Sequence, residues 1–537
     1  MENKFLGKSI SGCFTIPSGI ITANVKVIER IANEIPEIGV ITTKSIGIAP
    51  RDGNREPIFS QYAPGCFVNA VGLTNPGAEE FVKQLSKIKI PKDRFLLVSI
   101  FGKDVEEFVS VAKIIAPVAD GLELNLSCPH ASGYGMAIGQ NPDLVQKITK
   151  AVKGAVNIPV IPKLTPNVPN IGIIAQAVVA GGADAICAIN TVGPGYYTVD
   201  GNPVLTNKKG GMSGKGILPI GLKCVKEISE AVNVPIIGCG GISSAVDVKE
   251  YQKAGASIFG IGSALIGLST HQLKEYFRTL DQDVKAETHS AVKLLKQNIN
   301  MHFTKCKIVE NKKLADDLSI IVFDKNIKIK AGQFIFAWIP EVGEKPFSVL
   351  DDDPLTLMIY TKGCFTKKLA SLSEGSEVYF RGPYGNAIEI EGNPKMLLVS
   401  GGCGMAAVYQ IARDFNNTEL FIGAKDKDHL FYVEKAKDYS NVYVATDDGS
   451  EGYHGFVTDL LKEKLQNMQL DENVIFFNCG PEQMIKSAVE VEKKFVSPDK
   501  IYNSIDYITK CGVGICGSCA SADGRRLCVD GPFLNVG

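Results

Sequence analysis

The chain has 537 residues, of which 45% are hydrophobic and 21% charged, a composition typical of a globular protein with several domains. Its formal net charge of −1 gives no electrostatic reason to expect nucleic acid or an anionic membrane as a partner. No apolar run approaches the roughly 20 residues that cross a bilayer, and the start, MENKFLGKSISG, lacks the apolar core of a signal peptide, so we expect a cytoplasmic protein without a membrane partner.

Apolar runs of strand length recur through the first 300 residues, with helical patterns between them. Most are continuous stretches of Val, Ile and Leu, which is typical of parallel strands that are buried on both faces. Eight strand–helix units in this length predict an α/β fold, a (β/α)8 TIM barrel over residues 1–300. The runs are 13–18, 39–44, 95–102, 121–127, 158–164, 185–190, 234–241 and 257–263.

Polar residues collect where these runs end, and the carboxyl ends of barrel strands are where such folds place their active sites. The runs are followed or closed by Lys44, Asn125, Cys128, Lys163, Asn190 and Thr191. The last two runs end in Gly240–Gly241 and Gly262–Ser263, small residues whose backbone N–H groups suit a phosphate. The pattern therefore predicts an active site at the mouth of the barrel.

Six motifs make this region recognisable: VNAVGLTNPG (68–77), LNLSCPH (124–130), KLTPNV (163–168), INTVG (189–193), GGMSG (210–214) and IIGCGGI (236–242). Together they resemble the dihydroorotate dehydrogenase family, and the resemblance covers nearly all of residues 1–300. It implies a bound FMN and the oxidation of dihydroorotate to orotate in de novo pyrimidine (UMP) biosynthesis. That reaction removes one proton and one hydride from the substrate ring.

The resemblance also implies roles for single residues. Cys128 would be the base that takes the proton, and a thiol suits this because neighbouring cations can lower its pKa. The backbone N–H groups of Gly72 and Leu73 would receive the substrate carboxylate. The other substrate residues would be Lys44, Asn69, Asn125, His130, Asn190 and Thr191. FMN would be held by Ser18, Lys44, Ser45, Asn125, Lys163, Gly214, Gly240, Gly241, Gly262 and Ser263.

Two alternatives stay open at this point. Many members of the family have Asn where this chain has His130, and the SCPH sequence also occurs in NAD(P)H-linked dihydropyrimidine dehydrogenases, which reduce uracil and thymine. The Gly72–Leu73 pair favours a substrate with a carboxylate, which uracil lacks. The second alternative is an electron-transfer flavoprotein with a non-catalytic barrel, and the presence of Cys128 and Lys163 argues against it.

After residue 300 the runs LSIIVFD, QFIFAWIP and LTLMIYT predict short antiparallel strands of a small β-barrel over residues 301–392. KPFSVL (345–350) and TKGCFTKKL (361–369) resemble the FAD-binding elements of ferredoxin-reductase-type modules, as in the electron-transfer subunit of NAD-linked dihydroorotate dehydrogenases. Lys345 stands where that family usually has Arg, which keeps the charge but loses the bidentate guanidinium. The implied FAD residues are Lys345, Pro346, Phe347, Ser348, Gly363 and Thr366.

MLLVSGGCGMAAVYQIA (396–412) predicts a strand, a Gly-rich turn and a helix that could receive a dinucleotide pyrophosphate. TDDGSEGYHGFVTDLL (446–461) and NCGPEQM (478–484) resemble NAD-binding elements of the same electron-transfer family. We therefore expect an α/β NAD domain over residues 393–500, with Glu419 as a possible ribose ligand. The implied NAD residues are Gly402, Gly404, Asp447 and Gly480.

Residues 501–537 contain four cysteines, Cys511, Cys516, Cys519 and Cys528, three of them within nine residues. This spacing favours a [2Fe–2S] cluster over zinc, whose ligands usually come as two separated pairs. The resemblance then implies an electron route from FMN through the cluster and FAD to NAD⁺, on one fused chain that forms a homodimer through its barrel. We interpret the other scattered cysteines, Cys187 and Cys239 among them, as small buried apolar side chains.

Overall fold

The computed structural model describes residues 3–126, 136–286, 299–470, 473–505 and 508–536. The chain forms two compact units, Met1–Ile299 with Val513–Arg526, and Asn300–Gly512 with Leu527–Gly537. The short segment Val513–Arg526 therefore packs with the first unit, although more than 200 residues separate it from the rest of that unit in the sequence. No described helix is long and apolar enough to cross a membrane.

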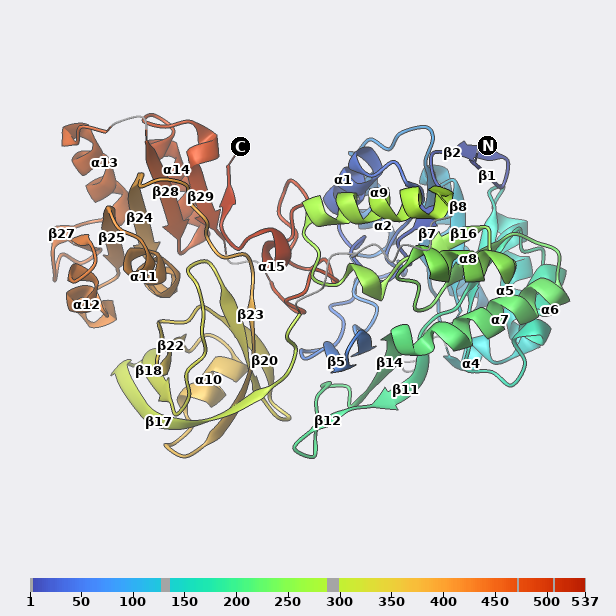
Figure 1. The fold of residues 1–537 in the computed structure, drawn as a ribbon, viewed down its shortest axis with the longest axis horizontal. Helices are drawn as coiled ribbons and strands as arrows, with labels where there is room; N and C mark the ends of the chain where they lie inside the picture. The colour runs from blue at the N-terminus through green and yellow to red at the C-terminus, as the bar shows by residue number, and fades with distance from the viewer. Residues whose placement is uncertain (1–2, 127–135, 287–298, 471–472, 506–507, 537) are drawn as a thin grey trace. The chain divides into compact units, whose positions relative to one another are not determined.

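A closed barrel of eight parallel strands forms the core of the first unit, which confirms the predicted fold (Figure 1). Each strand lies within one of the eight predicted runs or extends one residue beyond it, and nearly all of their side chains are buried. Around the barrel the strands follow the order β10-β15-β16-β3-β4-β7-β8-β9. They are β3 (Phe14–Thr15), β4 (Ile38–Thr42), β7 (Phe95–Ile100), β8 (Gly121–Asn125), β9 (Val160–Leu164), β10 (Ile186–Ala188), β15 (Ile236–Cys239) and β16 (Ile258–Gly260).

Helices surround this barrel, and most begin at a residue whose side chain accepts a hydrogen bond from a backbone N–H of the first turn. Asn24, Asp104, Asn141, Asn170 and Ser244 do this for α1, α3, α5, α6 and α8. The helices are α1 (Val25–Glu34), α2 (Ala78–Leu85), α3 (Val105–Ile115), α4 (Met136–Gly139), α5 (Pro142–Ala155), α6 (Ile171–Ala180), α7 (Leu218–Ala231), α8 (Ala245–Lys253) and α9 (Thr270–Ala286).

A second, four-stranded sheet stands outside the barrel in the same unit, and the sequence analysis did not predict it. Its strands run in the order β11-β14-β6-β5, with β5 (Phe59–Ala63), β6 (Cys66–Asn69), β11 (Val192–Tyr196) and β14 (Lys209–Gly214). Two small hairpins, β1–β2 (Asn3–Phe5, Lys8–Ile10) and β12–β13 (Thr198–Val199, Asn202–Pro203), complete the strands of this unit. The sheet carries Asn69 at one strand end and Gly214 at another, so it contributes residues to the predicted site.

The second unit begins with a seven-stranded antiparallel sheet of order β20-β19-β23-β17-β18-β22-β21. The expected antiparallel strands are present, but β20 and β21 are the two ends of a sheet that does not close in the described residues. The long strand β17 pairs with β23 through its first half and with β18 through its second, with register shifts that let it bend. The elements are β17 (Thr304–Ala315), β18 (Leu318–Phe323), β19 (Phe334–Ile339), β20 (Gly343–Phe347), β21 (Asp351–Asp352), β22 (Leu355–Tyr360), α10 (Cys364–Ala370) and β23 (Glu377–Tyr384).

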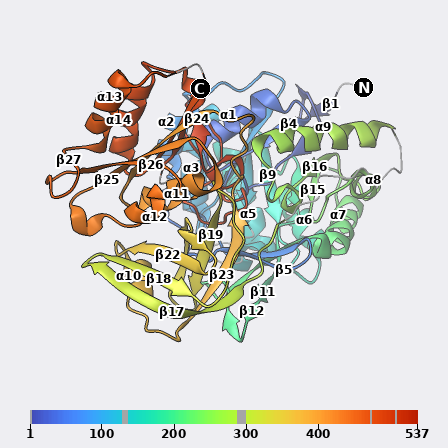
Figure 2. The ribbon, with the colours of Figure 1, turned by 60° about the vertical axis from the view of Figure 1, so that its left-hand side comes forward.

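A second sheet of seven strands follows, in the order β27-β26-β25-β24-β28-β29-β30, and all neighbours are parallel except β29 and β30. The helix α11 covers one face of this sheet, and α13 and α14 cover the other (Figure 2). Side chains of α11 pack with Leu398 and Phe477, and those of α13 and α14 pack with Val399 and Phe476. The elements are β24 (Lys395–Gly401), α11 (Met405–Asp414), β25 (Thr418–Ala424), α12 (Val433–Lys437), β26 (Asn441–Thr446), β27 (Tyr453–His454), α13 (Val457–Asn467), β28 (Val474–Cys479), α14 (Glu482–Glu492), β29 (Ile501–Ser504), α15 (Leu527–Asp530) and β30 (Leu534–Asn535).

Candidate active site

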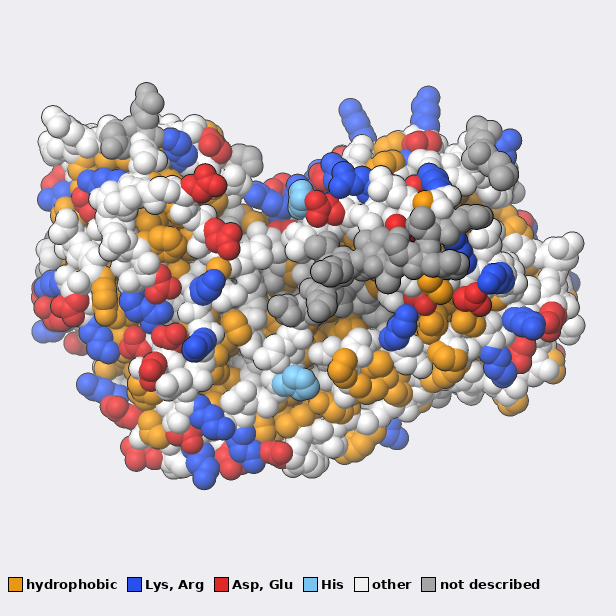
Figure 3. Space-filling view, viewed as in Figure 1, with side chains coloured by type: hydrophobic (Ala, Val, Ile, Leu, Met, Phe, Trp, Pro, Cys, Tyr) orange, Lys and Arg blue, Asp and Glu red, His pale blue; other side chains and the backbone are white. Residues whose placement is uncertain are grey.

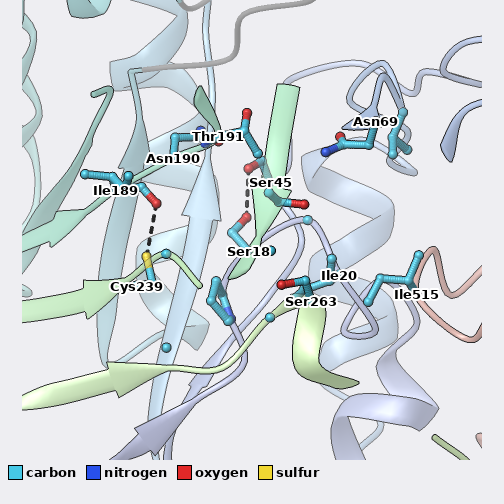
Figure 4. A pocket seen from close by; sticks show the side chains of 18 of the residues that line it. Ser18, Ile20, Ser45, Asn69, Ile189, Asn190, Thr191, Cys239, Ser263 and Ile515 are labelled. Atoms are coloured by element: carbon cyan, nitrogen blue, oxygen red, sulfur yellow. Dashed lines mark hydrogen bonds between the residues drawn. The ribbon is translucent and has the colours of Figure 1, made fainter. Parts of the chain in front are cut away.

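A cavity of about 190 Å³ opens at the carboxyl ends of the barrel strands (Figure 4). Every described residue that the sequence analysis assigned to FMN or substrate lines it, although these residues come from many separate segments. They are Ser18, Lys44, Ser45, Asn69, Gly72, Leu73, Asn125, Lys163, Asn190, Thr191, Gly214, Gly240, Gly241, Gly262 and Ser263. The predicted base, Cys128, and His130 lie outside the described residues.

A chain of hydroxyl groups forms one polar side of the cavity. Ser45 Oγ lies 3.0 Å from Ser18 Oγ and 2.9 Å from Ser99 Oγ, and it accepts a hydrogen bond of 2.8 Å from Asn125 Nδ2. Ser99 is fully buried, whereas Ser18 and Ser45 line the cavity. Since Asn125 Nδ2 is fixed in this way, its amide plane is oriented before any ligand binds.

The turn at Gly72–Leu73 has the backbone of an anion site. Both residues have positive φ, 85° and 58°, and a Cβ at position 72 would lie 2.6 Å from the backbone nitrogen of Asn54. Within the described part of the chain, neither backbone N–H donates to a protein acceptor. Asn75 fixes the turn, because its Nδ2 donates to the Leu73 carbonyl oxygen at 2.9 Å while its Oδ1 accepts from the N–H groups of Gly47 and Gly77. Two N–H donors therefore lie at the cavity wall, as a bound carboxylate requires.

The loops after β15 and β16 have the character of a phosphate cradle. Gly240 and Gly241 both have positive φ, and a Cβ at position 241 would lie 2.9 Å from the Gly214 carbonyl oxygen. The N–H groups of Gly241, Gly262 and Ser263 have no protein acceptor among the described residues. Small residues and unpaired N–H groups are what a phosphate needs, so this corner fits the phosphate of a flavin mononucleotide.

Lys163, on β9, is the buried cation of the cavity, with 4% of its surface exposed. Burial alone would lower its pKa, but the Glu123 carboxylate and the thiols of Cys187 and Cys239 outweigh this, so the pKa lies above its ordinary value. Lys163 therefore carries a full positive charge. Glu123, on β8, is 1% exposed, and its Oε1 has no hydrogen-bond partner in the described structure. The sequence analysis missed Glu123 because it points into the barrel from the middle of a strand.

Cys239, at the end of β15, lines the cavity and was interpreted from sequence only as a buried apolar residue. Its Sγ donates to the Ile189 carbonyl oxygen at 3.1 Å (Figure 4). The neighbouring Cys187 thiol lowers the pKa of Cys239, and the same interaction raises that of Cys187 well above its ordinary value. The bond from Cys239 to the Ile189 carbonyl holds the backbone just before Asn190. The Asn190 Oδ1 in turn accepts a hydrogen bond of 2.7 Å from the Thr191 N–H.

A second cavity, of about 310 Å³, lies in the other unit and is lined by residues of both of its sheets. Six of the residues assigned to FAD or NAD line it, namely Pro346, Phe347, Ser348, Thr366, Gly404 and Gly480. The other four, Lys345, Gly363, Gly402 and Asp447, are not among its lining residues. Gly404 must be small, because a Cβ there would overlap the Cys479 carbonyl oxygen. The turn after β24 can therefore lie close against the end of β28, where Gly480 meets the same cavity.

Glu419 does not fit the ribose role considered for it. It is the second residue of β25, whereas ligands of parallel sheets bind beyond the carboxyl ends of the strands. Its carboxylate forms an ion pair of 2.6 Å with Lys395, the first residue of β24. Both residues therefore lie at the amino ends of their strands. From sequence alone the strand could not be bounded well enough to separate its two ends.

The four closing cysteines, Cys511, Cys516, Cys519 and Cys528, are all buried, and none forms a disulfide. Gly512, Gly514 and Gly517, which stand between the first three, have positive φ of 78°, 72° and 72°. No group of three or more His, Cys, Asp or Glu among the described residues has the arrangement of a metal site. The iron–sulfur cluster therefore stays a prediction from the spacing.

Comparison with known proteins matches both halves of the chain. The family model described as Dihydroorotate dehydrogenase matches residues 1–282, and the Oxidoreductase NAD-binding domain model matches residues 398–490. A dehydrogenase of this kind with an NAD-binding domain implies flavin and NAD as its cofactors.

Curated relatives match the first half of the chain. The "Dihydroorotate dehydrogenase B (NAD(+)), catalytic subunit" of Methanocaldococcus jannaschii is 48% identical over 254 residues, covering 47% of this chain and 82% of the relative. The protein of the same name from Pyrococcus horikoshii is 40% identical over 294 residues, covering 55% of this chain and 95% of the relative. A chain from the structure described as "Insights into flavin-based electron bifurcation via the NADH-dependent reduced ferredoxin-NADP oxidoreductase structure" is 29% identical, with a TM-score of 0.39, and covers 43% of this chain and 87% of that chain.

The barrel, the cavity at its mouth and the family match agree over the first unit. Since the family model spans residues 1–282, more than half of the 537 residues, the chain belongs to the dihydroorotate dehydrogenase family.

Proposed function

We propose that this chain oxidises dihydroorotate to orotate and passes the electrons to NAD⁺, as a fused NAD-dependent dihydroorotate dehydrogenase. One observation carries the proposal. Fifteen described residues that the family resemblance assigns to flavin or substrate come from separate segments and line the same cavity at the barrel mouth. The relatives with 40–48% identity, all named for this reaction, support the same substrate.

In the barrel, the amides of Asn69, Asn125 and Asn190 would bind the polar edges of the pyrimidine ring. The N–H groups of Gly72 and Leu73, with the Lys44 ammonium, would hold the ring carboxylate by charge-assisted hydrogen bonds. Cys128 would remove the ring proton, and Lys163 would stabilise the negative charge that the flavin ring gains when it accepts the hydride. FMN bound in this cavity would supply the hydride acceptor.

The second unit would carry the electrons onward. Its cavity would hold FAD against Pro346, Phe347 and Ser348, and NAD would approach it at the Gly404 and Gly480 turns. A [2Fe–2S] cluster on the four closing cysteines would carry electrons singly from FMN to FAD, and FAD would return them as a hydride to NAD⁺. The cysteine spacing, the burial of all four thiols and the three glycines with positive φ support the cluster.

The test is an anaerobic titration of the purified chain with dihydroorotate while flavin and cluster absorbance are recorded. We expect stoichiometric bleaching of the flavin, followed by NADH formation when NAD⁺ is added. A chain that binds flavin but is not reduced by dihydroorotate would refute the proposal and favour a non-catalytic barrel.

The substrate has a separate test, because the SCPH sequence with His130 also occurs in uracil-reducing enzymes. Two charge-assisted hydrogen bonds to a carboxylate contribute about 1.5–3 kcal/mol each. Orotate should therefore inhibit at least about 100-fold more strongly than uracil, which has no carboxylate. Inhibition constants measured on one preparation decide this, and tighter binding of uracil would assign the chain to the pyrimidine reductases.

We also propose that the chain forms a homodimer through its barrel and works in the cytoplasm. Ile173, Ile220 and Val246 are 50%, 37% and 52% exposed, and each lies in the first turn of one of three consecutive barrel helices, α6, α7 and α8. Apolar and charged side chains both reach the surface on the face seen in Figure 3. Light scattering after gel filtration gives the oligomeric state, and the I220K variant should yield monomers. Every described cysteine is free, which suits a reducing compartment.

A further inference from the structure

We propose that the segment Val513–Arg526 completes the flavin cavity of the barrel, with Ile515 as a flavin-contacting residue and Arg526 as the positioning residue that holds it. The inference rests on the proposed function, since it takes flavin as the occupant of that cavity. It adds a wall that the barrel fold does not itself supply. The segment lies more than 200 residues after the barrel in the sequence, yet Ile515 and Cys516 line the same cavity as Lys44 and Ser263.

Backbone hydrogen bonds attach the segment to the loops after two neighbouring barrel strands. The Ile21 N–H, beyond β3, donates to the Ile515 carbonyl oxygen at 2.6 Å. The Gly267 N–H, beyond β16, donates to the Val513 carbonyl oxygen at 2.9 Å. Since β3 and β16 pair with each other, both anchors lie on one side of the barrel mouth. The segment is thus fixed at the residues on either side of Gly514.

Glycines let the segment lie this close. A Cβ at Gly517 would lie 2.9 Å from the Ile21 carbonyl oxygen, and a Cβ at Gly524 would lie 2.7 Å from the Lys26 carbonyl oxygen. Both glycines also have positive φ. The segment is therefore shaped to the loop after β3 and to the start of α1.

Arg526 closes the attachment from the other end of the segment. It is 1% exposed, and its Nη1 donates to the Gly514 carbonyl oxygen at 2.6 Å while its Nη2 donates to the Leu268 carbonyl oxygen at 2.9 Å. One rigid guanidinium thus joins the residue before Ile515 to the loop after β16. Lysine cannot reproduce this geometry, because its single ammonium lacks the planar fork.

The Ile515 side chain contributes an apolar surface to the cavity. It is 4% exposed, and Figure 4 shows it directed toward Ile20 and Ser263, with Asn190 and Thr191 on the other side of the view. Together with Ile20 and Ile266 it makes one end of the cavity apolar, whereas Asn69, Asn190 and Thr191 are polar. An isoalloxazine ring has a methylated benzene edge and a polar pyrimidine edge. The apolar end matches the benzene edge, so Ile515 contributes affinity for flavin by burying it.

The experiment measures the release of FMN and FAD separately from the purified holoenzyme on dilution, with the two flavins resolved by chromatography. I515N should raise the FMN dissociation constant by roughly ten- to a hundredfold, the range expected for one buried aliphatic side chain, and leave FAD retention unchanged. I515L should retain most of the affinity. I508N is the matched control, because Ile508 is the same residue type, is 67% exposed and does not line the cavity.

Thermal unfolding separates a flavin contact from a merely structural role. A contact with flavin narrows the difference in Tm between the FMN-loaded and FMN-free forms of I515N, whereas a structural role lowers both equally. R526K and R526M should also release FMN faster than the wild-type chain while keeping FAD. Unchanged FMN affinity in I515N, with wild-type FMN content confirmed, would overturn the inference. A wild-type chain that binds no FMN would instead contradict the proposed function.

Discussion

At the scale of single residues, the charge balance at the barrel cavity depends on Lys163 and Glu123. Both are almost fully buried, and the carboxylate is one reason why the pKa of Lys163 stays above its ordinary value. A buried charge that loses its partner is strongly destabilising, whereas removal of both charges costs less. Any substitution of Lys163 therefore changes both the stability of the folded chain and the rate of flavin reduction, and the two effects must be separated.

We predict that K163M lowers the rate of flavin reduction by dihydroorotate by about 10²-fold, because a donor aimed at developing charge is removed. It should also lower the free energy of unfolding, since Glu123 is left buried without its cation. The double variant K163M/E123Q should recover much of the stability but none of the rate. Stopped-flow reduction and denaturant unfolding measure the two effects, and recovery of the rate in the double variant would assign Lys163 a purely structural role.

A second prediction concerns Cys128, whose proposed role as the base comes from the LNLSCPH motif alone. C128A should retain FMN but slow flavin reduction by at least about 10²-fold, the usual contribution of a positioned base. The rate of flavin reduction in C128S should lie between those of the wild-type chain and C128A, because a hydroxyl is a weaker base than a thiolate. Stopped-flow absorbance of the flavin measures the rate, and near-normal reduction of C128A would exclude this residue as the base.

At the scale of elements, the sequence predicted the strands and their ends better than anything that lies between elements. Lys44, Lys163 and Asn190 were located correctly because a parallel barrel brings all carboxyl ends to one mouth. Glu123 and Cys239 were missed because an inward side chain within an apolar run has no pattern of its own. Glu419, considered as a possible ribose ligand, lies near the amino end of β25, whereas a ligand would bind beyond the carboxyl end.

The contact of α14 with β28 contains a buried carboxyl group. Glu492, the last residue of α14, is fully buried and accepts a hydrogen bond of 2.8 Å from Asn478 Nδ2 on β28. Burial raises the pKa of Glu492 to about 8, and the hydrogen bond from Asn478 only partly opposes this. Near neutral pH the folded chain therefore holds a proton here that the unfolded chain releases.

We predict that this proton makes the second unit less stable as the pH rises. The contribution of Glu492 to the free energy of unfolding is fully present below the pKa of about 4.5 that this group has in the unfolded chain. It is lost as the pH rises through about 8, the pKa in the folded chain. Between these values the free energy of unfolding should fall by at most about 1.4 kcal/mol per pH unit from this group. E492Q, which stays neutral, should remove that slope. Chemical denaturation of both proteins from pH 5 to 8 measures it, and parallel pH profiles would show that Glu492 is ionised in the folded chain.

At the scale of the whole molecule, the chain order does not follow the division into units. The sequence analysis treated residues 501–537 as one closing module, whereas contacts assign Val513–Arg526 to the barrel unit and Leu527–Gly537 to the other. This could not be predicted from the sequence, because the anchors of Val513 and Ile515 are backbone hydrogen bonds to loops that have no sequence signature. The four-stranded sheet beside the barrel was missed for a similar reason, since its strands are short and its central pairing, β6 with β14, joins residues more than 100 apart in the sequence.

The cysteine loop gives the prediction that involves both units. If Cys519 is a cluster ligand, C519S should abolish the cluster and stop NADH formation, while dihydroorotate still bleaches the barrel flavin, since that step needs only the cavity of the first unit. C13S is the matched control, because Cys13 is also a free cysteine but lies outside the closing loop and outside both cavities. Iron content, anaerobic flavin bleaching and NADH formation are measured on the same preparations. If C519S loses its flavins as well as its iron, flavin bleaching and NADH formation, the variant is misfolded, which circular dichroism and FMN content reveal. Full NADH formation by C519S protein without iron would refute the route through the cluster, because the electrons would then pass between the flavins without it.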